Sequence, residues 1–309
     1  MGILDGKVAI VTGAGHGVGR GEALELAAQG AKVVVNDVGA TVRGDGESDE
    51  KASEVVAQII RDRGGEATAN SDDISDWEGA SRLVAQAVSD FGRLDILVNN
   101  AGILRDSMIV SMTETDFDAV IKVHVKGTFA TTHHAANYWR NESKEGRQPR
   151  AAIVNTVSSA GLQGNVGQAN YGAAKAGIAA LTVISSLELS RYGVRANAIA
   201  PGGFTRMVGV AMKDIVVKEP EEFDEFDPMN PGNSAPMVAF LASDQALHVT
   251  GQVFRAVGSS ILHYKGWTQG PEITTEGRWD PAAIADAVNG DIFGTRATGL
   301  KMPKRPKKA

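Results

Sequence analysis

The sequence predicts an α/β fold of the Rossmann-like type, with a doubly wound parallel sheet in three layers and a C-terminal extension. Runs rich in Val and Ile recur along the chain, and they suit strands that are buried on both faces. Amphipathic stretches with helical periodicity separate these runs. A glycine-rich segment directly follows the first run, where folds of this type turn from strand into helix. Alternating strands and helices favour a parallel sheet with helices on both faces.

The expected elements follow from these patterns. The apolar runs predict strands over residues 8–12, 31–36, 94–99, 151–157, 194–200 and 252–257. The amphipathic stretches predict helices over residues 54–63, 78–91, 116–139 and 173–192.

The chain length of 309 residues is compatible with one open-sheet domain and an appendage. We expect a dehydrogenase domain over residues 1–261 and an extension over 262–295 that packs on the domain or on a dimer partner. Residues 296–309 hold six basic residues and no acidic one, which predicts a disordered tail. Two long connections, residues 38–50 and 205–236, interrupt the alternation of strands and helices. The second contains an acidic stretch that is either a cover over the substrate or a solvated loop.

Composition excludes several classes of function. The chain has no cysteine, and its six histidines lack the spacing of a zinc site, so no catalytic metal is expected. A net charge of -6 argues against nucleic-acid binding. The N-terminus lacks the apolar region of a signal peptide, and no run approaching 18 apolar residues is apparent. These features predict a cytoplasmic protein that binds no membrane.

The segment from Thr12 to Gly19 predicts a dinucleotide site. Glycines in such a turn let backbone N–H groups approach a pyrophosphate at the positive end of a helix. The expected contacts are Gly13, Gly15, His16, Gly17, Val18 and Gly19. Asp37 ends the second strand, where a carboxylate accepts hydrogen bonds from ribose hydroxyls and repels a 2′-phosphate, so NAD is favoured over NADP. The alternative is an aspartate that only shapes the turn. Asp73 and Ile74, after the third strand, are expected at the adenine edge.

Tyr171 and Lys175 are expected one turn apart on the same face of a helix. A free phenol titrates near pH 10 and is a poor base, but a nearby ammonium and a positive nicotinamide ring would lower its pKa. Ser158 ends the preceding strand and can hydrogen-bond a substrate oxygen. These three residues predict acid/base chemistry on an alcohol or ketone.

These motifs, together with Asn99-Asn-Ala101-Gly102 and Pro201-Gly202, resemble the short-chain dehydrogenase/reductase family over residues 5 to about 260. The resemblance implies that the glycine loop and the Asn99 segment bind the cofactor, together with Pro201, Gly202 and Thr205. It also implies that Ser158 orients the substrate carbonyl and that Tyr171 is the general acid/base. Lys175 would hold the nicotinamide ribose and lower the pKa of Tyr171.

Further stretches, such as the one from Val123 to Gly127, resemble the (3R)-hydroxyacyl-CoA dehydrogenase units of peroxisomal multifunctional enzymes. No hydratase or sterol-carrier part and no terminal peroxisomal signal are present, so we expect a stand-alone dehydrogenase. Two positions depart from the general family pattern. His124 replaces an asparagine of a proton relay and is either part of that relay or a packed helix residue. Gly258-Ser-Ser260 replaces an acidic residue and two glycines, so the resemblance does not predict the conformation of the turn after the last strand.

The leading hypothesis is NAD-dependent oxidation of a 3-hydroxyacyl-CoA to a 3-oxoacyl-CoA. The alternatives are a hydroxysteroid dehydrogenase, a 3-oxoacyl carrier-protein reductase and a sensor of the nicotinamide redox state that does not turn over. The helices over 116–139 and 173–192 are rich in alanine and apolar on more than one side, which predicts a homodimer or homotetramer.

Overall fold

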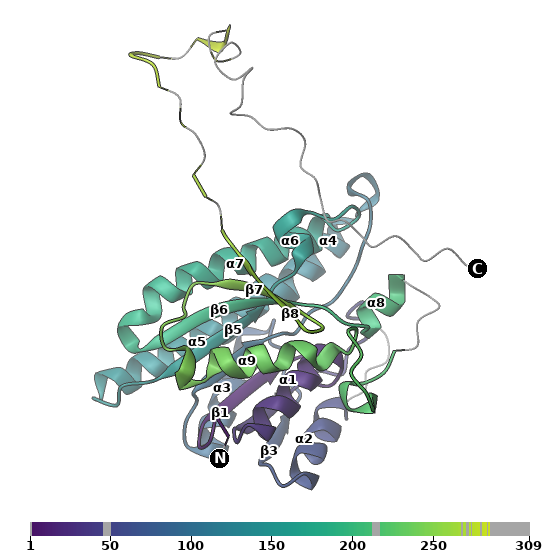
Figure 1. Cartoon of the computed structure of the whole chain (residues 1–309), viewed down its shortest axis with the longest axis vertical. Helices are drawn as coiled ribbons and strands as arrows, with labels where there is room; N and C mark the ends of the chain where they lie inside the picture. Colours follow the sequence, from purple (N-terminus) through teal and green to yellow (C-terminus); the bar gives the residue numbers. More distant parts are fainter. Residues whose placement is uncertain are drawn as a thin grey trace, which may run out of the picture.

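A computed structural model describes residues 2–45, 51–211 and 217–266, and beyond these residues 268–269, 272, 274–278, 280–282 and 284. Its centre is a single sheet of eight strands in the order β3-β2-β1-β4-β5-β6-β7-β8 (Figure 1). All neighbours pair in parallel except β7 and β8. The strands are β1 (Val8–Thr12), β2 (Lys32–Asn36), β3 (Ala67–Asn70), β4 (Ile96–Asn99), β5 (Ala151–Thr156), β6 (Val194–Pro201), β7 (Val253–Val257) and β8 (Ser260–Tyr264).

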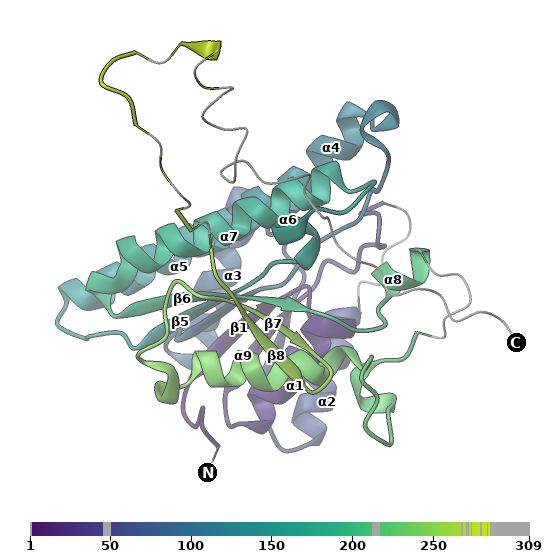
Figure 2. The same ribbon diagram turned by 45° about the horizontal axis from the view of Figure 1, so that its top comes forward.

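Helices cover both faces of this sheet. They are α1 (Gly17–Ala28), α2 (Ala52–Asp62), α3 (Trp77–Phe91), α4 (Glu114–Ile121), α5 (Gly127–Lys144), α6 (Ser159–Gln163), α7 (Ala169–Leu189), α8 (Arg206–Ala211) and α9 (Ala235–Ala242). Figure 2 shows α5 and α7 on one side of the sheet and α1, α2 and α9 on the other. The three-layer Rossmann-like fold predicted from the sequence is confirmed.

Two apolar cores hold the layers together. On one face, Leu26 of α1, Ile60 of α2 and Leu241 of α9 pack against alternate residues of β1, β2 and β4. On the other face, Leu83 of α3 and Trp139 of α5 pack against the intervening residues of the same strands. Strands buried on both faces in this way explain the continuous Val and Ile runs in the sequence.

The expected helix over residues 116–139 is wrong in its detail. The chain forms α4, then a π-helical segment Lys122–Lys126, and then α5, which continues to Lys144. A π-helical turn inserts an extra residue, widens the helix locally and changes the direction of the side chains that follow. His124 lies in this segment, so its direction could not be derived from regular helical spacing.

The turn left open after the last parallel strand is a tight hairpin. Val257 pairs with Ser260, and the two residues between them make the turn, with Gly258 at φ 54°. Glycine adopts this left-handed conformation without steric cost. The expected boundary at residue 261 therefore falls inside β8. Residues 268–282 are exposed in the single chain where they are described, and 296–309 lie outside the described residues.

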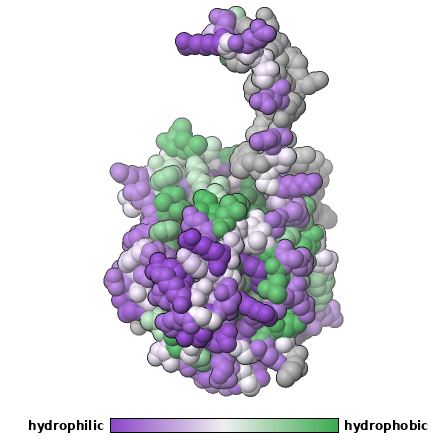
Figure 3. Space-filling view, turned by 90° about the vertical axis from the view of Figure 1, so that its left-hand side faces the viewer, coloured by the Kyte–Doolittle hydropathy of each residue, from purple (hydrophilic) through white to green (hydrophobic). Residues whose placement is uncertain are grey.

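One helical segment is long and apolar enough to cross a membrane by length and composition alone, although it is not an unbroken apolar run. Residues Ala169–Tyr192 have the length and a mean hydropathy of 1.3 that such a span requires. This segment contains α7, whose inward residues, such as Ile178, pack on the sheet. Apolar side chains also reach the surface in several places on the face drawn in Figure 3. The composition of α7 therefore reflects a sheet-covering helix whose outer face is apolar.

Candidate active site

Ser158, Tyr171 and Lys175 meet at the carboxyl end of β5, as the sequence predicts. Tyr171 lies in the first turn of α7, and the Lys175 Nζ lies 5.6 Å from the centroid of its ring. Lys175 Nζ donates a hydrogen bond of 2.6 Å to the carbonyl of Thr156, which ends β5. Ser158 is the N-cap residue of α6, and its hydroxyl accepts from the N–H of Ala160. The end of β5, the start of α6 and the first turns of α7 thus hold the three side chains close together.

Burial is the largest influence on the pKa values of Tyr171 and Lys175 in the chain alone. It raises the pKa of Tyr171 to about 12, and Asp106 adds to this, while the hydrogen bond with Ser158 acts in the opposite direction. It lowers the pKa of Lys175 to about 7, against the charge of Glu22. The expected lowering of the Tyr171 pKa by Lys175 is therefore absent here, because desolvation of the phenolate outweighs other effects.

Glu22 is a buried carboxyl that the sequence analysis missed. It is fully buried in α1, and neither carboxylate oxygen has a hydrogen-bond partner among the described residues. Burial raises its pKa to about 8, although the charge of Lys175 lowers it. A signal was present, since Glu22 shares the inward stripe of α1 with Gly19, Ala23 and Leu26.

His124 contacts the segment that follows β4. Its Nε2 lies 2.9 Å from the carbonyl oxygen of Ile103 and 3.1 Å from the Ile103 nitrogen. Burial, aided by the charge of Lys175, lowers the pKa of His124 to about 3 against the effect of the Ile103 bond. A Cβ on Gly102 would lie 2.2 Å from the imidazole, so only glycine fits there. A neutral imidazole in this place positions the segment, and a role in a proton relay stays a prediction.

The glycine loop packs so closely against its neighbours that side chains would not fit at several of its positions. A Cβ on Gly13 would lie 2.6 Å from the Ala101 Cα, and one on Gly19 would lie 2.3 Å from the Gly13 carbonyl oxygen. The Asp37 carboxylate accepts from the N–H groups of Gly15 and Gly39, at 2.9 and 2.7 Å. Asp37 therefore lies beside the loop. This position is compatible with binding of a cofactor ribose and equally with a role in shaping the turn only.

A carboxylate of the protein itself lies at the N-terminal, positive end of α1. The Glu219 carboxylate accepts from the Gly17 N–H at 2.7 Å and contacts His16 Nδ1 at 2.6 Å. This carboxylate occupies a position suited to a phosphate oxygen, because the first N–H groups of a helix bind negative charge. The loop and the helix end together fit a dinucleotide.

The remaining predicted cofactor residues divide into two groups. Thr205 faces the glycine loop, with its methyl carbon 3.2 Å from where a Gly17 Cβ would lie, and Gly202 leaves room for Val257. Pro201 ends β6, Ala101 donates its N–H to the Thr12 hydroxyl, and Val18 lies in the first turn of α1.

The second group points into the protein or into a local turn. The Asn99 side chain is buried and bonds to Asn155, Thr131 and Thr132. The Asp73 carboxylate accepts from Ser75, and Ile74 is buried.

Asn100 was not predicted and links the two cofactor segments. Its amide donates to the carbonyls of Thr12 and Gly13, both at 3.0 Å. The Asn-Asn-Ala-Gly motif identified the segment, but the sequence could not tell which of its two asparagines faces the glycine loop.

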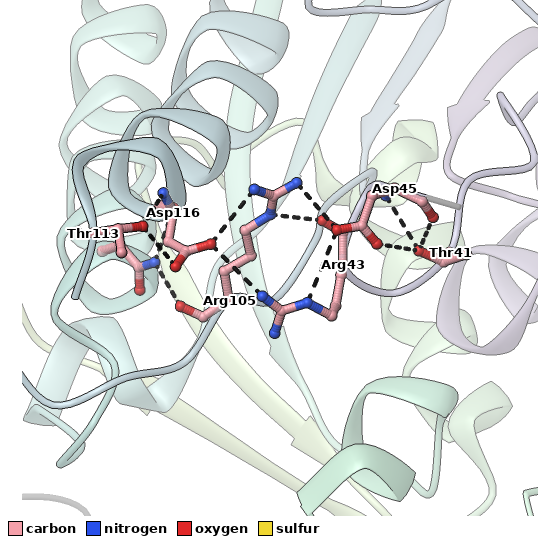
Figure 4. A network of polar contacts seen from close by, with 7 residues as sticks. Thr41, Arg43, Asp45, Arg105, Thr113 and Asp116 are labelled. Carbon is pink, nitrogen blue, oxygen red and sulfur yellow. Dashed lines mark hydrogen bonds and ion pairs between the residues drawn. The ribbon is translucent and has the colours of Figure 1, made fainter. Parts of the chain in front are cut away.

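A polar network joins the loops that follow β2 and β4 (Figure 4). Arg105 lies 3.4 Å from Asp116 and 3.6 Å from Asp45, and it donates to the carbonyl of Arg43 at 2.8 Å. Arg43 in turn lies 3.6 Å from Asp116. The Leu104 N–H also donates to the Val42 carbonyl at 2.8 Å. The described part of the long loop is therefore fixed to the segment beside the catalytic residues.

Comparisons with known proteins agree with this geometry. Residues 7–214 match the family model described as short chain dehydrogenase. The chain is 44% identical over 300 residues to the hydroxyacyl-CoA dehydrogenase ChsB1 of Mycobacterium tuberculosis, with 95% of this chain and 90% of that protein covered. It is 42% identical to the peroxisomal multifunctional enzyme type 2 of Drosophila melanogaster, where 78% of this chain spans 37% of the relative. A crystal structure of a short chain dehydrogenase from Mycobacterium avium superposes with a TM-score of 0.83 at 50% identity, covering 93% of this chain and 95% of that one.

Proposed function

The chain belongs to the short-chain dehydrogenase family and is an NAD(P)-dependent oxidoreductase that acts on CH–OH groups, and we propose that it oxidises a 3-hydroxyacyl-CoA to a 3-oxoacyl-CoA with NAD. The observation that carries the proposal is a complete Ser158, Tyr171 and Lys175 arrangement in a chain closely similar to a protein named hydroxyacyl-CoA dehydrogenase. The presence of all three residues argues against a sensor without turnover.

Each catalytic side chain has a separate task in this proposal. A bound nicotinamide would accept the hydride from the substrate carbon. The Ser158 hydroxyl donates a hydrogen bond to the substrate oxygen, and the Tyr171 phenolate takes the proton from that oxygen. The Lys175 ammonium lies beside the phenol ring and favours its ionised form once a positive ring is also close. The Thr156 carbonyl keeps the ammonium in place.

The preference for NAD rests on Asp37. Its carboxylate lies against the glycine loop, where a ribose hydroxyl can share it and a 2′-phosphate would be repelled. Arg43, the next basic residue along the chain, lies close to the carboxylates of Asp45 and Asp116. Within the described part of the chain, the Asp37 carboxylate forms no ion pair with a basic side chain.

A specificity panel tests the substrate. We expect kcat/KM with NAD to be highest for 3-hydroxyacyl-CoA thioesters and at least tenfold lower for hydroxysteroids. A steroid would leave at least one polar group of the site without its substrate partner, which costs about 1.4 kcal/mol or more of transition-state binding. The panel includes reduction of a 3-oxoacyl carrier protein with NADPH. A 3-oxoacyl-[acyl-carrier-protein] reductase of Synechocystis is 38% identical to this chain, and the match covers the whole length of that reductase. A higher kcat/KM in that reaction would replace the proposal.

Oligomeric state and compartment are also proposals. The outer face of α7 exposes Val183, Ile184 and Leu187, the last at 73%, and a symmetric contact would bury them. Light scattering should therefore give a multiple of 32.4 kDa. We place the protein in the cytoplasm, and imaging of a fluorescent fusion would test this because several relatives are named as peroxisomal.

A further inference from the structure

A segment from far along the chain lies on the cofactor loop. Glu219 is 202 residues from Gly17, yet its carboxylate accepts the Gly17 N–H at 2.7 Å. Its other oxygen lies 2.6 Å from His16 Nδ1, and the Glu219 and His16 side chains are only 20% and 24% exposed. The carboxylate therefore lies in a partly enclosed position at the start of α1.

Neighbouring contacts fix this segment, residues 217–222, on α1. Arg20 donates to both carboxylate oxygens of Glu221. The Pro220 carbonyl accepts from the Asn230 side chain at 3.0 Å, and Pro220 lies beside Gly21. Within the segment, Glu222 accepts the N–H of Glu219 and closes a short 3-10 turn. The approach of Glu219 to the glycine loop is thus supported on both sides.

The charge of Glu219 is well defined. Burial alone would raise its pKa, but the bonds from His16 and Gly17 and the charge of Arg20 together lower the pKa below its ordinary value. Glu219 is therefore an anion at neutral pH. An N–H at the start of a helix attracts any nearby anion, and two anions held there repel each other.

We infer that Glu219 competes with the pyrophosphate of the dinucleotide for the start of α1, so that the segment 217–222 leaves the glycine loop when the cofactor binds. The same segment follows β6 and α8 along the chain. Cofactor binding is thereby coupled to the position of this segment on α1. Glu219 lowers cofactor affinity and is not itself a catalytic residue.

Binding of ADP-ribose, which carries the pyrophosphate and no nicotinamide, tests this inference without turnover. Glu219→Gln keeps the size of the side chain and removes its charge. We expect the Kd of ADP-ribose to fall about tenfold. In the variant, the pyrophosphate no longer has to displace a charged carboxylate from its hydrogen bond with the Gly17 N–H. The Kd of adenosine should stay the same. Glu225→Gln removes the same charge from an exposed position in the same acidic stretch and should change neither value.

Two further measurements keep the test decisive. Glu221→Gln loosens the contact with Arg20 and should also lower the Kd of ADP-ribose, which covers the case of an unstable Glu219 variant. In the wild type, ADP-ribose should speed amide hydrogen exchange over residues 217–222, and adenosine should not. An unchanged or higher Kd in Glu219→Gln, or unchanged or slower exchange with ADP-ribose, would show that Glu219 supports the glycine loop and does not compete. Because no substrate is used, these outcomes are independent of the substrate proposal.

Discussion

The imidazole of His124 stands edge-on to the phenol ring of Tyr171, with the ring centroids 5.3 Å apart and the planes at 84°. The same imidazole contacts the backbone of Ile103 on its other side. His124 therefore connects Tyr171 with the segment that follows β4. Aromatic pairs in this arrangement stabilise a fixed ring orientation.

His124→Ala should lower both the melting temperature and kcat without changing the pH dependence of the reaction. The loss of a buried ring costs about 2 to 4 kcal/mol of stability. Because the pKa of His124 is about 3, its ionisation does not fall in the neutral range. Kinetic pH profiles and thermal melts check this, with His133→Ala on the exposed side of α5 as the control. A neutral-range ionisation that disappears only in His124→Ala would contradict a positioning role.

Tyr171→Phe should reduce kcat by a factor of about 10² to 10⁴ and leave the affinity for NADH nearly unchanged. The phenol acts on the substrate proton, whereas the ring and its contact with His124 remain. Steady-state kinetics and a cofactor titration measure the two effects. Tyr192→Phe, in the short turn after α7, controls for loss of a phenol elsewhere. A variant that keeps a tenth of wild-type kcat would rule out Tyr171 as the acid/base.

Ser158→Ala should move the alkaline ionisation of the enzyme to higher pH. The hydrogen bond from Ser158 stabilises the Tyr171 phenolate, so its loss adds to the effect of burial, which already raises the pKa to about 12. Alcohol oxidation should rise with pH in both forms, and at any one pH it should be slower in the variant. Tyrosinate absorbance during a pH titration gives a readout without substrate. Ser159→Ala, which removes the hydroxyl bonded to Tyr264, is the matched control. A shift to lower pH would contradict the assignment.

Glu22→Gln should make the protein more resistant to alkaline pH. Burial raises the pKa of Glu22 to about 8 in the folded chain, from an ordinary value of 4.5 in the unfolded chain. The folded state therefore binds more protons between these values, and the free energy of unfolding falls as the pH rises through them. The fall is at most about 1.4 kcal/mol per pH unit. Thermal melts across this window should show a growing advantage for the variant, and none for the control Glu25→Gln. A constant difference between variant and wild type would contradict the buried ionisation.

Asp37→Asn should shift the ratio of kcat/KM for NADP to that for NAD upward by roughly tenfold, or about 1.4 kcal/mol. The change removes a repulsive charge while keeping an acceptor for the N–H groups of Gly15 and Gly39. Asp62→Asn, at the end of α2, controls for a general loss of negative charge. An unchanged ratio would identify Asp37 as a residue that only shapes the turn.

The sequence predicted the parallel core of the fold better than its edges. The central strands are largely apolar and buried, so the pattern located each of them to within two residues. The edge strands β3 and β8 carry Thr, Asn, Ser and His, because each has a neighbour on one side only. Such short polar segments give no periodic signal.

The candidate site divides in a similar way. Tyr171 and Lys175 lie in one helical turn and Ser158 lies close by in sequence, so local spacing sufficed to group them. Glu219 could not be placed at the glycine loop, because no local rule relates residues that are about 200 positions apart. Glu22 was visible as a charge on an apolar stripe, but its burial follows from the packing of α1 against α9 and the sheet.

The network that joins Arg43, Asp45, Arg105 and Asp116 has a consequence for the evolution of relatives and for the exchange of parts between them (Figure 4). Asp37 lies directly before the loop that carries Arg43, whereas Arg105 comes three residues after Gly102 in the segment beside the catalytic tyrosine. A chimera that took only one of these loops from a relative would leave an arginine or an aspartate without its partner. We therefore expect that a functional chimera needs both loops from the same parent, and that a change in one loop calls for a matching change in the other.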